Sequence, residues 1–346
     1  MSFGGVAFGQ AQTNPYNPNK DLEAPSPPSD GISDLCWSPV ANHVVATSWD
    51  GQALCWEAST YGCQPKAACR TEGPLLCGSF SQDGSGVFLG GTDGKVSLWD
   101  LASGSKREVG SHQAPVRHCA WLPGLNALVT GSWDRTLRYW DVRQPNPVCT
   151  CQLPERVYAL DAKDRLLVVG MADRHIHAYT LSQPQTPYKA LQSPLKHQTR
   201  CVACFPDQSG YLIGSVEGRV AVQHVEASLA SKNFTFRCHR EGQDIFAVNA
   251  ASFHPTHGTF VTAGSDGSYN FWDKDSKQRL KALSKAAAPI TAAKFNRDGA
   301  LMAYAVSYDW SRGSQQHDPA TAKNLVLVRP IQEGEVKARA RAPTRR

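Results

Sequence analysis

Short runs in which apolar and polar residues alternate recur along this chain, and an acidic residue stands in the turn between one run and the next. In residues 130–141 the first run ends before Asp134, and the second ends at Trp140. Alternation with a period of two predicts β-strands, and Asp-Gly or Asp-Arg pairs predict the hairpin turns that join them. The same order of turn acid and closing tryptophan appears in three further places: Asp50 with Trp56, Asp93 with Trp99, and Asp266 with Trp272.

Weaker copies of this pattern fill the intervals between the strong ones. Asp173 leads to Tyr179 and Glu217 leads to Gln223, whereas at Asp309 an insertion displaces the closing strand. The seven turn acids are 39 to 49 residues apart. A period of about 40 to 45 residues with a Trp-Asp signature predicts an all-β fold, a seven-bladed WD40 β-propeller with four strands in each blade.

Closure of such a ring needs a strand from each end of the chain. The last repeat ends after residues 324–328, and we expect a short strand at residues 20–24 to complete its blade, so that neither end leaves a free sheet edge. The propeller should then span residues 21–330. Two long connections interrupt the repeats: residues 227–244, whose alternating pattern predicts an ordered strand, and residues 307–323, which should project from one face.

Both ends of the chain differ in composition from the repeats. Residues 1–20 are rich in Gly, Gln, Asn and Pro and contain Phe3-Gly4 and Phe8-Gly9, which predicts a flexible leader. Residues 331–346 form a basic C-terminal tail, and they contribute to the net charge of +6. This tail is either a solubilising end or a contact for nucleic acid or an import receptor.

The composition indicates a soluble intracellular protein without a metal site. The first residues lack the basic and apolar regions of a secretory signal, and no apolar run approaches the length of about 18 residues that a membrane span needs. Eleven cysteines, many on predicted strands, are typical of buried thiols in a reducing compartment. Neither Cys201-x-x-Cys204 nor Cys149-x-Cys151 has a second pair or a histidine at zinc spacing.

Four polar and aromatic residues of the best repeat, His112, Ser132, Asp134 and Trp140, resemble the hydrogen-bonded tetrad of WD repeats. A Ser, a His and an Asp also suggest a hydrolase triad, but a triad needs an exposed nucleophile and an oxyanion hole. A set that recurs within a structural repeat is better suited to satisfying buried polar groups. The glycine-rich stretches match neither a dinucleotide-binding loop nor a P-loop, so we expect no enzymatic activity and no cofactor.

Two surfaces remain as candidate binding sites. Arg219 lies in the turn of blade five, whose closing aromatic is missing, and Arg240 lies in the connector that follows. Arginines can form forked hydrogen bonds with carboxylates of a partner peptide, but a solvated arginine in an exposed turn is the alternative.

The second surface is the basic stretch after the tryptophan of blade six, with Phe236 nearby across the connector. Basic residues beside exposed rings suit single-stranded nucleic acid, because bases stack while phosphates pair with cations. The alternative is that Trp272 is a core residue of its repeat and that the following lysines are solvated. The residues of this surface are Phe236, Trp272, Asp273, Lys274, Lys277 and Arg279.

The segments that deviate most from the repeat resemble one family closely, the mRNA export factor, a WD-repeat nucleoporin. The segments that carry the resemblance are residues 193–201, 214–221, 233–240, 264–275 and 307–313. The resemblance implies a scaffold of the nuclear pore complex that binds the GLEBS hairpin of an FG nucleoporin, assists mRNA export and shuttles between nucleus and cytoplasm. It also implies that Arg219 and Arg240 contact the peptide, and that Phe236, Trp272, Asp273 and Lys274 belong to a nucleic-acid surface. Lys277 and Arg279 stand where the family also has basic residues, with the two types exchanged.

Two other functions stay open at this point. The mitotic checkpoint protein of the same superfamily also binds GLEBS-type peptides and shares the Glu-Gly-Arg and Cys-His-Arg segments. A substrate receptor of a cullin-type ubiquitin ligase would carry a short WDxR box, which Trp140, Asp141 and Arg143 match.

Overall fold

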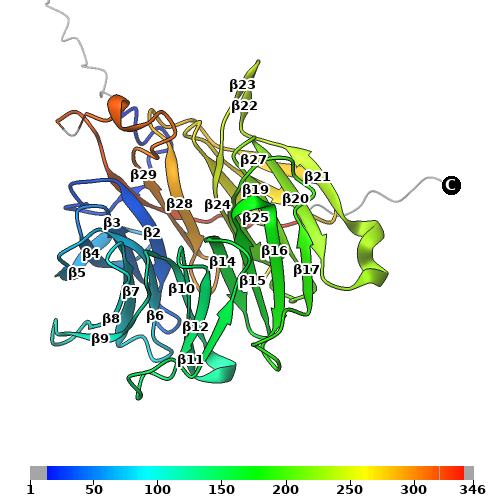
Figure 1. Cartoon of the computed structure of the whole chain (residues 1–346). Coiled ribbons are helices and arrows are strands. Elements are labelled where there is room, and N and C mark those ends of the chain that lie inside the picture. The colour runs from blue at the N-terminus through cyan, green and yellow to red at the C-terminus, as the bar shows by residue number, and fades with distance from the viewer. Residues whose placement is uncertain (1–13, 319, 339–346) are drawn as a thin grey trace, which may run out of the picture.

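The computed structural model describes residues 14–318 and 320–338, which form seven four-stranded antiparallel sheets (Figure 1). Blades one and two consist of β2 (Ile32–Trp37), β3 (His43–Ser48), β4 (Gln52–Ala58) and β5 (Cys63–Arg70), then β6 (Leu75–Phe80), β7 (Gly86–Gly91), β8 (Lys95–Asp100) and β9 (Lys106–Ser111). Blades three and four consist of β10 (Val116–Leu122), β11 (Ala127–Ser132), β12 (Thr136–Trp140) and β13 (Cys149–Gln152), then β14 (Val157–Lys163), β15 (Leu166–Met171), β16 (His175–Thr180) and β17 (Lys189–Gln192). Blades five and six consist of β18 (Thr199–Cys204), β19 (Gly210–Ser215), β20 (Arg219–His224) and β21 (Phe234–Arg237), then β24 (Val248–Phe253), β25 (Phe260–Gly264), β26 (Tyr269–Asp273) and β27 (Gln278–Ala282).

Blade seven combines both ends of the chain. Its strands are β28 (Ile290–Phe295), β29 (Leu301–Val306), β30 (Leu325–Pro330) and β1 (Leu22–Glu23). The other elements are a small hairpin of β22 (Arg240–Glu241) and β23 (Asp244–Ile245), the helical turn α1 (Glu333–Val336), and the 3-10 turns η1 (Pro123–Leu125), η2 (Ala172–Arg174), η3 (Ala227–Lys232) and η4 (Ser314–Gln316).

The innermost strands close a ring. Each contacts the next in the order β2, β6, β10, β14, β18, β24 and β28, and β28 contacts β2 again. This cyclic order confirms the predicted seven-bladed propeller.

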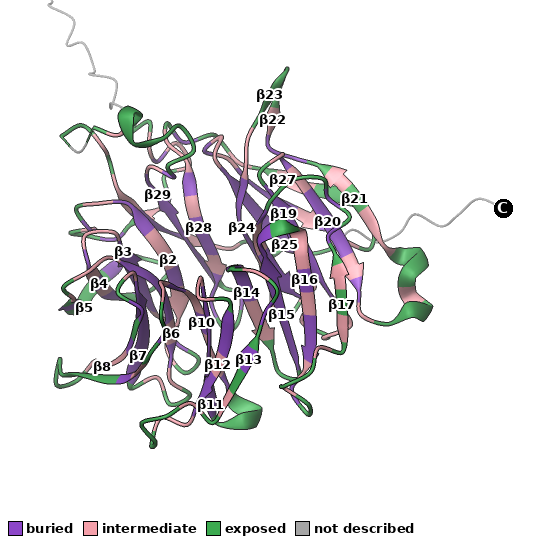
Figure 2. Ribbon diagram, viewed as in Figure 1, coloured by how far each residue is buried: buried purple, intermediate pink, exposed green. Residues whose placement is uncertain are grey.

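Burial follows the position of each strand in its blade (Figure 2). Every residue of β7, β11, β15, β19 and β29 is buried, because these second strands lie between neighbouring blades. The outer strands, such as β9 and β17, are mostly exposed or half-buried. A glycine in a second strand keeps adjacent blades close: a Cβ on Gly131 would come within 2.8 Å of Val157 in blade four.

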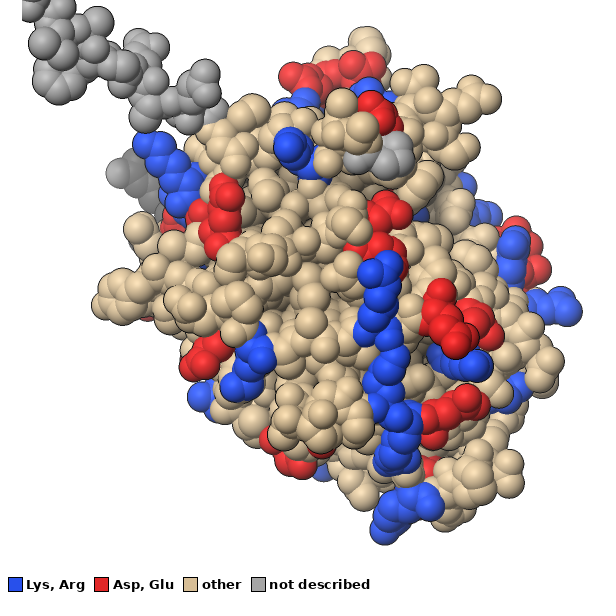
Figure 3. All heavy atoms as spheres, turned by 90° about the vertical axis from the view of Figure 1, so that its left-hand side faces the viewer, with Lys and Arg blue, Asp and Glu red and all other residues tan. Residues whose placement is uncertain are grey.

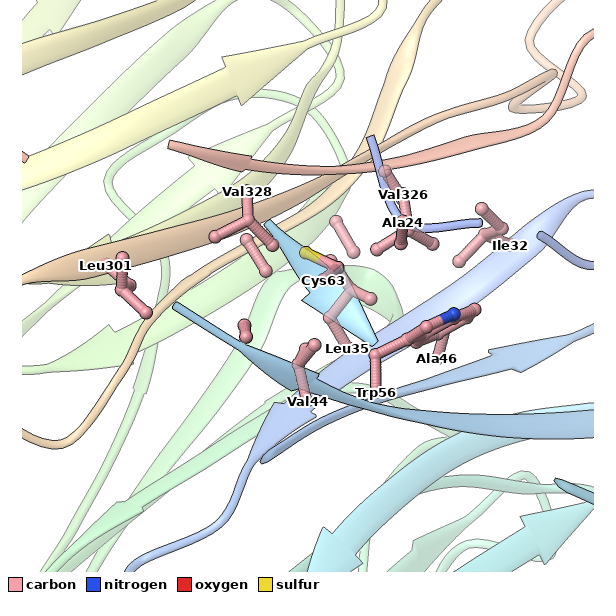
Figure 4. Close-up of a cluster of buried hydrophobic side chains, with 14 residues drawn as sticks. Ala24, Ile32, Leu35, Val44, Ala46, Trp56, Cys63, Leu301, Val326 and Val328 are labelled. Atoms are coloured by element: carbon pink, nitrogen blue, oxygen red, sulfur yellow. The ribbon is translucent and has the colours of Figure 1, made fainter. Parts of the chain in front are cut away.

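The N-terminal strand closes the ring, as predicted. In β1, Leu22 pairs with Val328 and Glu23 pairs with Leu327 of β30. An apolar cluster then joins blade seven to blade one, with the side chains of Ala24, Val326 and Val328 facing Trp56 (Figure 4).

Asp21, the residue directly before β1, anchors this closing strand. Its carboxylate is 8% exposed and accepts hydrogen bonds from the hydroxyls of Tyr269 at 2.9 Å and Tyr304 at 2.7 Å. Arg329 of β30 completes the set with an ion pair at 2.8 Å, and Arg329 also pairs with Glu335 of α1 at 2.7 Å. One buried carboxylate therefore links the N-terminal segment to blades six and seven.

Ordered residues extend beyond both ends of the predicted propeller span, residues 21–330. Residues 14–20 are ordered, because Asn17 is buried against Asp21 and Asn19 exchanges two hydrogen bonds with the backbone of Ser284. Residues 331–338 pack on the propeller, where Val336 is buried and its carbonyl accepts a hydrogen bond from Thr259. The two FG dipeptides and the tail from residue 339 lie outside the described residues.

The two long connections are ordered over their described parts. The first contains η3, the predicted strand as β21, and the β22–β23 hairpin, which rises from the edge of the molecule in Figure 1. The second does not simply project, because Asp309 is buried and accepts hydrogen bonds from Asn249 and Ser265 of blade six. In the described part of the chain, no helix is long and apolar enough to cross a membrane, and no cluster of three metal-binding side chains occurs. All eleven cysteines are free.

We expect Asp21→Asn to loosen the closure of the ring. The substitution removes the charge that Arg329 faces and leaves two buried tyrosine hydroxyls poorly matched, which should lower the free energy of unfolding by about 2 to 4 kcal/mol. Urea unfolding measures this loss, and hydrogen exchange should rise first in residues 14–24 and in β30. Asp164→Asn, an exposed turn substitution, should change neither quantity. Equal exchange in these segments of the variant and the wild type would contradict a closing role for Asp21.

Candidate functional site

The propeller has two faces, and they carry different candidate sites. We call the side that bears the turns between second and third strands the turn face; it also bears the connections into each next blade. Because strands alternate in direction, the turns between third and outer strands lie on the opposite face. Arg219 and Arg240 lie on the turn face, whereas Lys274 and Lys277 lie on the opposite face, at the outer edge of blade six.

The two predicted peptide-binding arginines meet at Glu217. Arg219 Nε lies 3.5 Å from Glu217 Oε2, and Arg240 donates a hydrogen bond to the Glu217 carbonyl oxygen at 2.9 Å. The side chain of Arg219 is 30% exposed, while Arg240 Nε and Glu217 Oε1 are buried without a hydrogen-bond partner among the described residues. Glu217 therefore holds Arg219 near the surface without using all of its donors.

An exposed apolar hollow adjoins this arginine cluster. Val216, Ile245 and Trp310 line a cavity of about 490 Å³ together with Phe246, and the first three are among the most exposed large apolar side chains in the described part of the chain. A second hollow of about 420 Å³ continues from Trp310 to Trp49 and Trp133. We call these two hollows together the aromatic mouth.

The blade-seven insertion builds one wall of the aromatic mouth. Trp310 contacts Trp49 edge to face at 6.1 Å between ring centroids, and it also packs against Tyr308 and His317. Asp309 anchors this wall, because burial would raise its pKa, but hydrogen bonds from Ser265, Ser311 and Asn249 outweigh burial and lower that pKa. The mouth is thus a preformed apolar surface with cations at its rim.

The predicted nucleic-acid residues converge between blades five and six. Phe236 of β21 lies 4.8 Å from Trp272 of β26, measured between ring centroids. Lys277 Nζ lies 4.8 Å from the ring centroid of Phe234, and Lys274 Nζ lies 5.3 Å from that of Phe205. We call Phe234, Phe236, Trp272, Lys274 and Lys277 the aromatic–lysine patch.

The charged residues of this predicted set differ in how far they are exposed and in whether they are already paired. Asp273 is buried and accepts hydrogen bonds from Asp275 and Ser276, so it shapes the turn instead of facing a ligand. Lys274 already pairs with Asp275 at 2.9 Å, and only 11% of its side chain is exposed. Lys277 and Arg279 are exposed and are the cations most open to a partner.

Charges of both signs share other parts of the surface. On the side drawn in Figure 3, lysines and arginines form a column with acidic side chains beside it, and neutral residues cover most of the area. The net charge of +6 is thus not gathered into one unbroken basic surface on this side.

The predicted tetrad forms around Thr130 instead of Ser132. His112 Nδ1 lies 2.9 Å from Asp134, His112 Nε2 lies 2.7 Å from Thr130 Oγ1, and Trp140 Nε1 donates to the same oxygen at 2.8 Å. Ser132 donates to the Ala114 carbonyl and accepts from the Asp134 backbone N–H, and it takes no part in the side-chain bonds among His112, Thr130, Asp134 and Trp140. Thr130 points into the blade beside Trp140, whereas Ser132 begins the turn. Burial would raise the pKa of Asp134, but the hydrogen bonds from His112 and Thr136 hold it well below its usual value.

A second network of the same kind lies in blade six. His239 joins Asp266 and Thr262, each at 2.9 Å, and Trp272 donates to Thr262 at 2.9 Å. Trp272 is therefore both a structural residue of its blade and the ring beneath Phe236. The core interpretation and the surface interpretation of this tryptophan both describe its position.

Comparison with known proteins identifies the family. The family model described as WD domain, G-beta repeat matches residues 18–57, 67–100, 104–141 and 230–273. The chain is 53% identical to Protein RAE1 of Arabidopsis thaliana, over 97% of this chain and 98% of that protein. It is 46% identical to mRNA export factor GLE2 of Chaetomium thermophilum, over 92% of both chains, and 43% identical to the Poly(A)+ RNA export protein of Schizosaccharomyces pombe, over 96% of this chain and 98% of that protein. The chain belongs to the mRNA export factor family of WD-repeat proteins.

Membership of the mRNA export factor family confirms the resemblance drawn from the deviant segments. The WD40 fold and the names of these relatives point to a non-enzymatic scaffold. The set resembling a hydrolase triad agrees with this, because His112 and Asp134 are occupied in the tetrad and Ser132 is 0% exposed.

The WDxR box is only partly accessible to a partner. Trp140 is 1% exposed, and its Nε1–H is donated to Thr130. Arg143 is exposed and forms a forked pair with Asp141 at 2.8 and 2.7 Å, which lowers the pKa of Asp141 to about 2. Asp141 and Arg143 alone face solvent.

Sequence reasoning missed the central threonines and the aromatic mouth. Thr130 and Thr262 each stand four residues before the turn acid, and this shared offset was available in the sequence. Trp49, Trp133 and Trp310 come from three blades far apart in the chain, so only the closed ring brings them together.

We predict that Thr130→Val destabilises the fold by about 2 to 4 kcal/mol, because it leaves the buried Trp140 N–H and a His112 nitrogen without a partner. The midpoint of urea unfolding measures this effect. Thr150→Val makes the same chemical change at an exposed position of the same blade and should stay within about 0.5 kcal/mol of wild type. If the two variants unfolded at the same urea concentration, the tetrad around Thr130 would make no measurable contribution to the stability of the fold.

Proposed function

We propose that this protein is a non-enzymatic scaffold of the nuclear pore that binds a GLEBS-type peptide of an FG nucleoporin on its turn face and assists mRNA export. It would act in the nucleus and at the nuclear envelope and shuttle to the cytoplasm. We further propose that it binds single-stranded RNA weakly at the aromatic–lysine patch. Family membership supports the role in mRNA export.

The observation that carries the peptide site is the contact between a cationic cluster and an exposed apolar surface. Val216 lines the aromatic mouth, and the next residue, Glu217, holds Arg219. Exposed apolar surface of this kind, rimmed by charged residues, is typical of protein-interaction sites. Two of the mouth's side chains, Ile245 and Trp310, are 51% and 37% exposed, so a partner that covers them gains apolar burial.

The charge of the cluster favours an acidic segment in that partner. Arg219 lies beside the Glu217 carboxylate, whereas Arg240 donates to the Glu217 backbone carbonyl and keeps its Nε–H without a partner among the described residues. A carboxylate from a peptide would supply the missing acceptor and form charge-assisted hydrogen bonds. An acidic peptide with apolar residues fits both halves of the site.

The geometry of the aromatic–lysine patch supports the RNA site. Rings of Phe234, Phe236 and Trp272 lie side by side, with centroids 6.1 Å and 4.8 Å apart, and Lys277 lies over the first ring. Bases stack on such rings irrespective of sequence, while nearby cations pair with phosphates. The small number of exposed cations, chiefly Lys277 and Arg279, explains why we expect weak binding.

Arg219→Glu should weaken binding of a GLEBS peptide about tenfold to a hundredfold. The variant places a carboxylate beside Glu217 and leaves the acidic group of the peptide without its donor, which costs about 1.5 to 3 kcal/mol at a partly solvated site. Calorimetric titration of the peptide measures the change, and circular dichroism checks the fold.

Two further variants distinguish a specific contact of Arg219 from a general effect of charge. Arg70→Glu makes the same charge change on an exposed edge of blade one and should leave affinity within about twofold of wild type. Glu217→Gln removes the competing carboxylate and should bind at least as tightly as wild type. An Arg219→Glu variant that binds the peptide within threefold of wild type would remove Arg219 from the site.

For RNA, we expect the double variant Lys277→Glu, Arg279→Glu to flatten the dependence of affinity on salt. Each lost phosphate contact on a single strand reduces the log–log slope by about 0.7, so the slope should fall by about 1.4. Fluorescence anisotropy with a labelled oligouridine at several salt concentrations gives both slopes.

The matched control is Lys163→Glu, Arg165→Glu, which has the same spacing and charge change in an exposed turn of blade four. It should retain the wild-type slope. Equal slopes for the wild type and the Lys277, Arg279 double variant would exclude the aromatic–lysine patch as the RNA-binding site. If RNA binding were lost only on deletion of residues 339–346, the site would be assigned to the tail.

A further inference from the structure

A small cavity on the turn face carries more positive charge than any function assigned so far explains. It measures about 270 Å³ and lies across the inner ends of blades three, four and five. We call it the arginine pocket, and its main lining residues are Arg117, Trp133, Arg156, Tyr158, Thr199 and Arg200. It borders the aromatic mouth, since Arg117, Trp133 and Arg200 line both.

No acidic residue lines this pocket. Among the described residues, Arg117 and Arg200 form no ion pair, and Arg156 has only Glu155, at 3.7 Å and outside the lining. Burial and then repulsion from Arg200 lower the pKa of Arg117, although Asp34, deeper in the central channel, acts in the opposite direction. Three guanidinium groups that line one cavity favour an anion of more than one charge.

Two uncharged donors in the pocket lack a hydrogen-bond partner. Trp133 Nε1 and Thr199 Oγ1 are both buried, and neither bonds to any described residue. Thr199 is only 1% exposed, so its hydroxyl is held in place. An indole N–H can only donate, and a buried donor without an acceptor is costly. A ligand rich in acceptor oxygens matches these donors as well as the guanidinium groups.

We propose that the arginine pocket binds the phosphate group of a phosphorylated serine or threonine in a peptide that crosses the turn face, an inference that rests on the peptide-binding function proposed above. A phosphate monoester carries a charge of about −1.5 to −2 and three acceptor oxygens, which matches several arginines and two neutral donors. The cavity of about 270 Å³ has room for a phosphate monoester. The shared wall with the aromatic mouth places this phosphate within reach of a peptide seated there.

A phosphodiester of RNA fits the pocket less well. It carries a single negative charge and continues into a sugar on both sides, whereas three guanidinium groups favour a terminal group of higher charge. The rings assigned above to the RNA site, Phe236 and Trp272, lie at the outer edge between blades five and six, away from this pocket.

The test uses the indole signal of Trp133 as a reporter. The full-length protein, labelled with ¹⁵N, is titrated with capped phosphoserine, and the Trp133 Nε1–H resonance, assigned from its loss in Trp133→Phe, is followed. We expect a saturable downfield shift as the indole donates to phosphate. Capped glutamate and dimethyl phosphate, which carry one charge, should bind about tenfold more weakly. Inorganic phosphate should bind more weakly than capped phosphoserine, because it makes no contact through a carrier.

Arg156→Gln should lower the affinity for capped phosphoserine about tenfold, because one charge-assisted contact is lost. Its side chain is 54% exposed, so the fold should be retained, and the dispersion of the other indole signals verifies this. Arg165→Gln, an exposed arginine on the opposite face, should leave the affinity unchanged.

Three results would overturn the inference. Capped glutamate binding as tightly as capped phosphoserine would make the pocket a carboxylate site, and equal binding of dimethyl phosphate would make it a site for a nucleic-acid backbone. Inorganic phosphate binding as tightly as capped phosphoserine would show an unspecific anion site. A parallel titration with the unphosphorylated GLEBS peptide separates the two proposals: if that peptide binds through Arg219 while phosphoserine fails to bind, only this inference falls, and the converse result leaves the pocket and removes the GLEBS site.

Discussion

The whole ring depends on the buried carboxylate of Asp21. A propeller is stable only when its first and last blades meet, and here the meeting requires a segment that precedes blade one to bind the edge of blade seven. The strand itself is two residues long, so its ladder is too short to hold the closure alone. Two tyrosine hydroxyls and the Arg329 guanidinium fix Asp21, and Arg329 continues to Glu335, which also pairs with Lys281 of blade six. Residues from both ends of the chain are therefore required before the aromatic mouth acquires its shape.

The sequence predicted the fold because each repeat signals itself locally. A turn acid, a closing aromatic and alternating apolar residues are properties of about a dozen consecutive residues, and short-range rules describe them well. The closing strand was predictable for a different reason. When the last blade lacks one strand, another segment of the chain must supply it. Composition does not show that residues 14–20 and 331–338 pack on the propeller, because Asn19 and Val336 bond to partners far away in the chain, Ser284 and Thr259.

The candidate sites were predictable only in part. Arg219 and Phe236 were singled out because they fall where the repeat pattern breaks down, and the structure places Arg219 beside Glu217 and Phe236 beside Trp272. The exchange of Ser132 for Thr130 shows the limit, since the two residues lie two positions apart in β11, are both 0% exposed, and differ only in their hydrogen-bond partners. The aromatic mouth and the arginine pocket gather residues from several blades, and no window of the sequence contains them.

Blade five links the two proposed binding sites through its own strand pairing. In the pair of β20 and β21, Arg219 stands opposite Arg237 and Val220 opposite Phe236. The arginine of the turn face and the ring of the aromatic–lysine patch are thus one register position apart, but Arg219 begins its strand and Phe236 packs outward against Trp272 of blade six. Trp272 is in turn fixed by Thr262 and His239, so the patch cannot shift without disturbing a buried hydrogen-bond network. The two proposed sites therefore share one blade, with the proposed peptide arginine at the turn and the proposed RNA-binding ring at the outer strand.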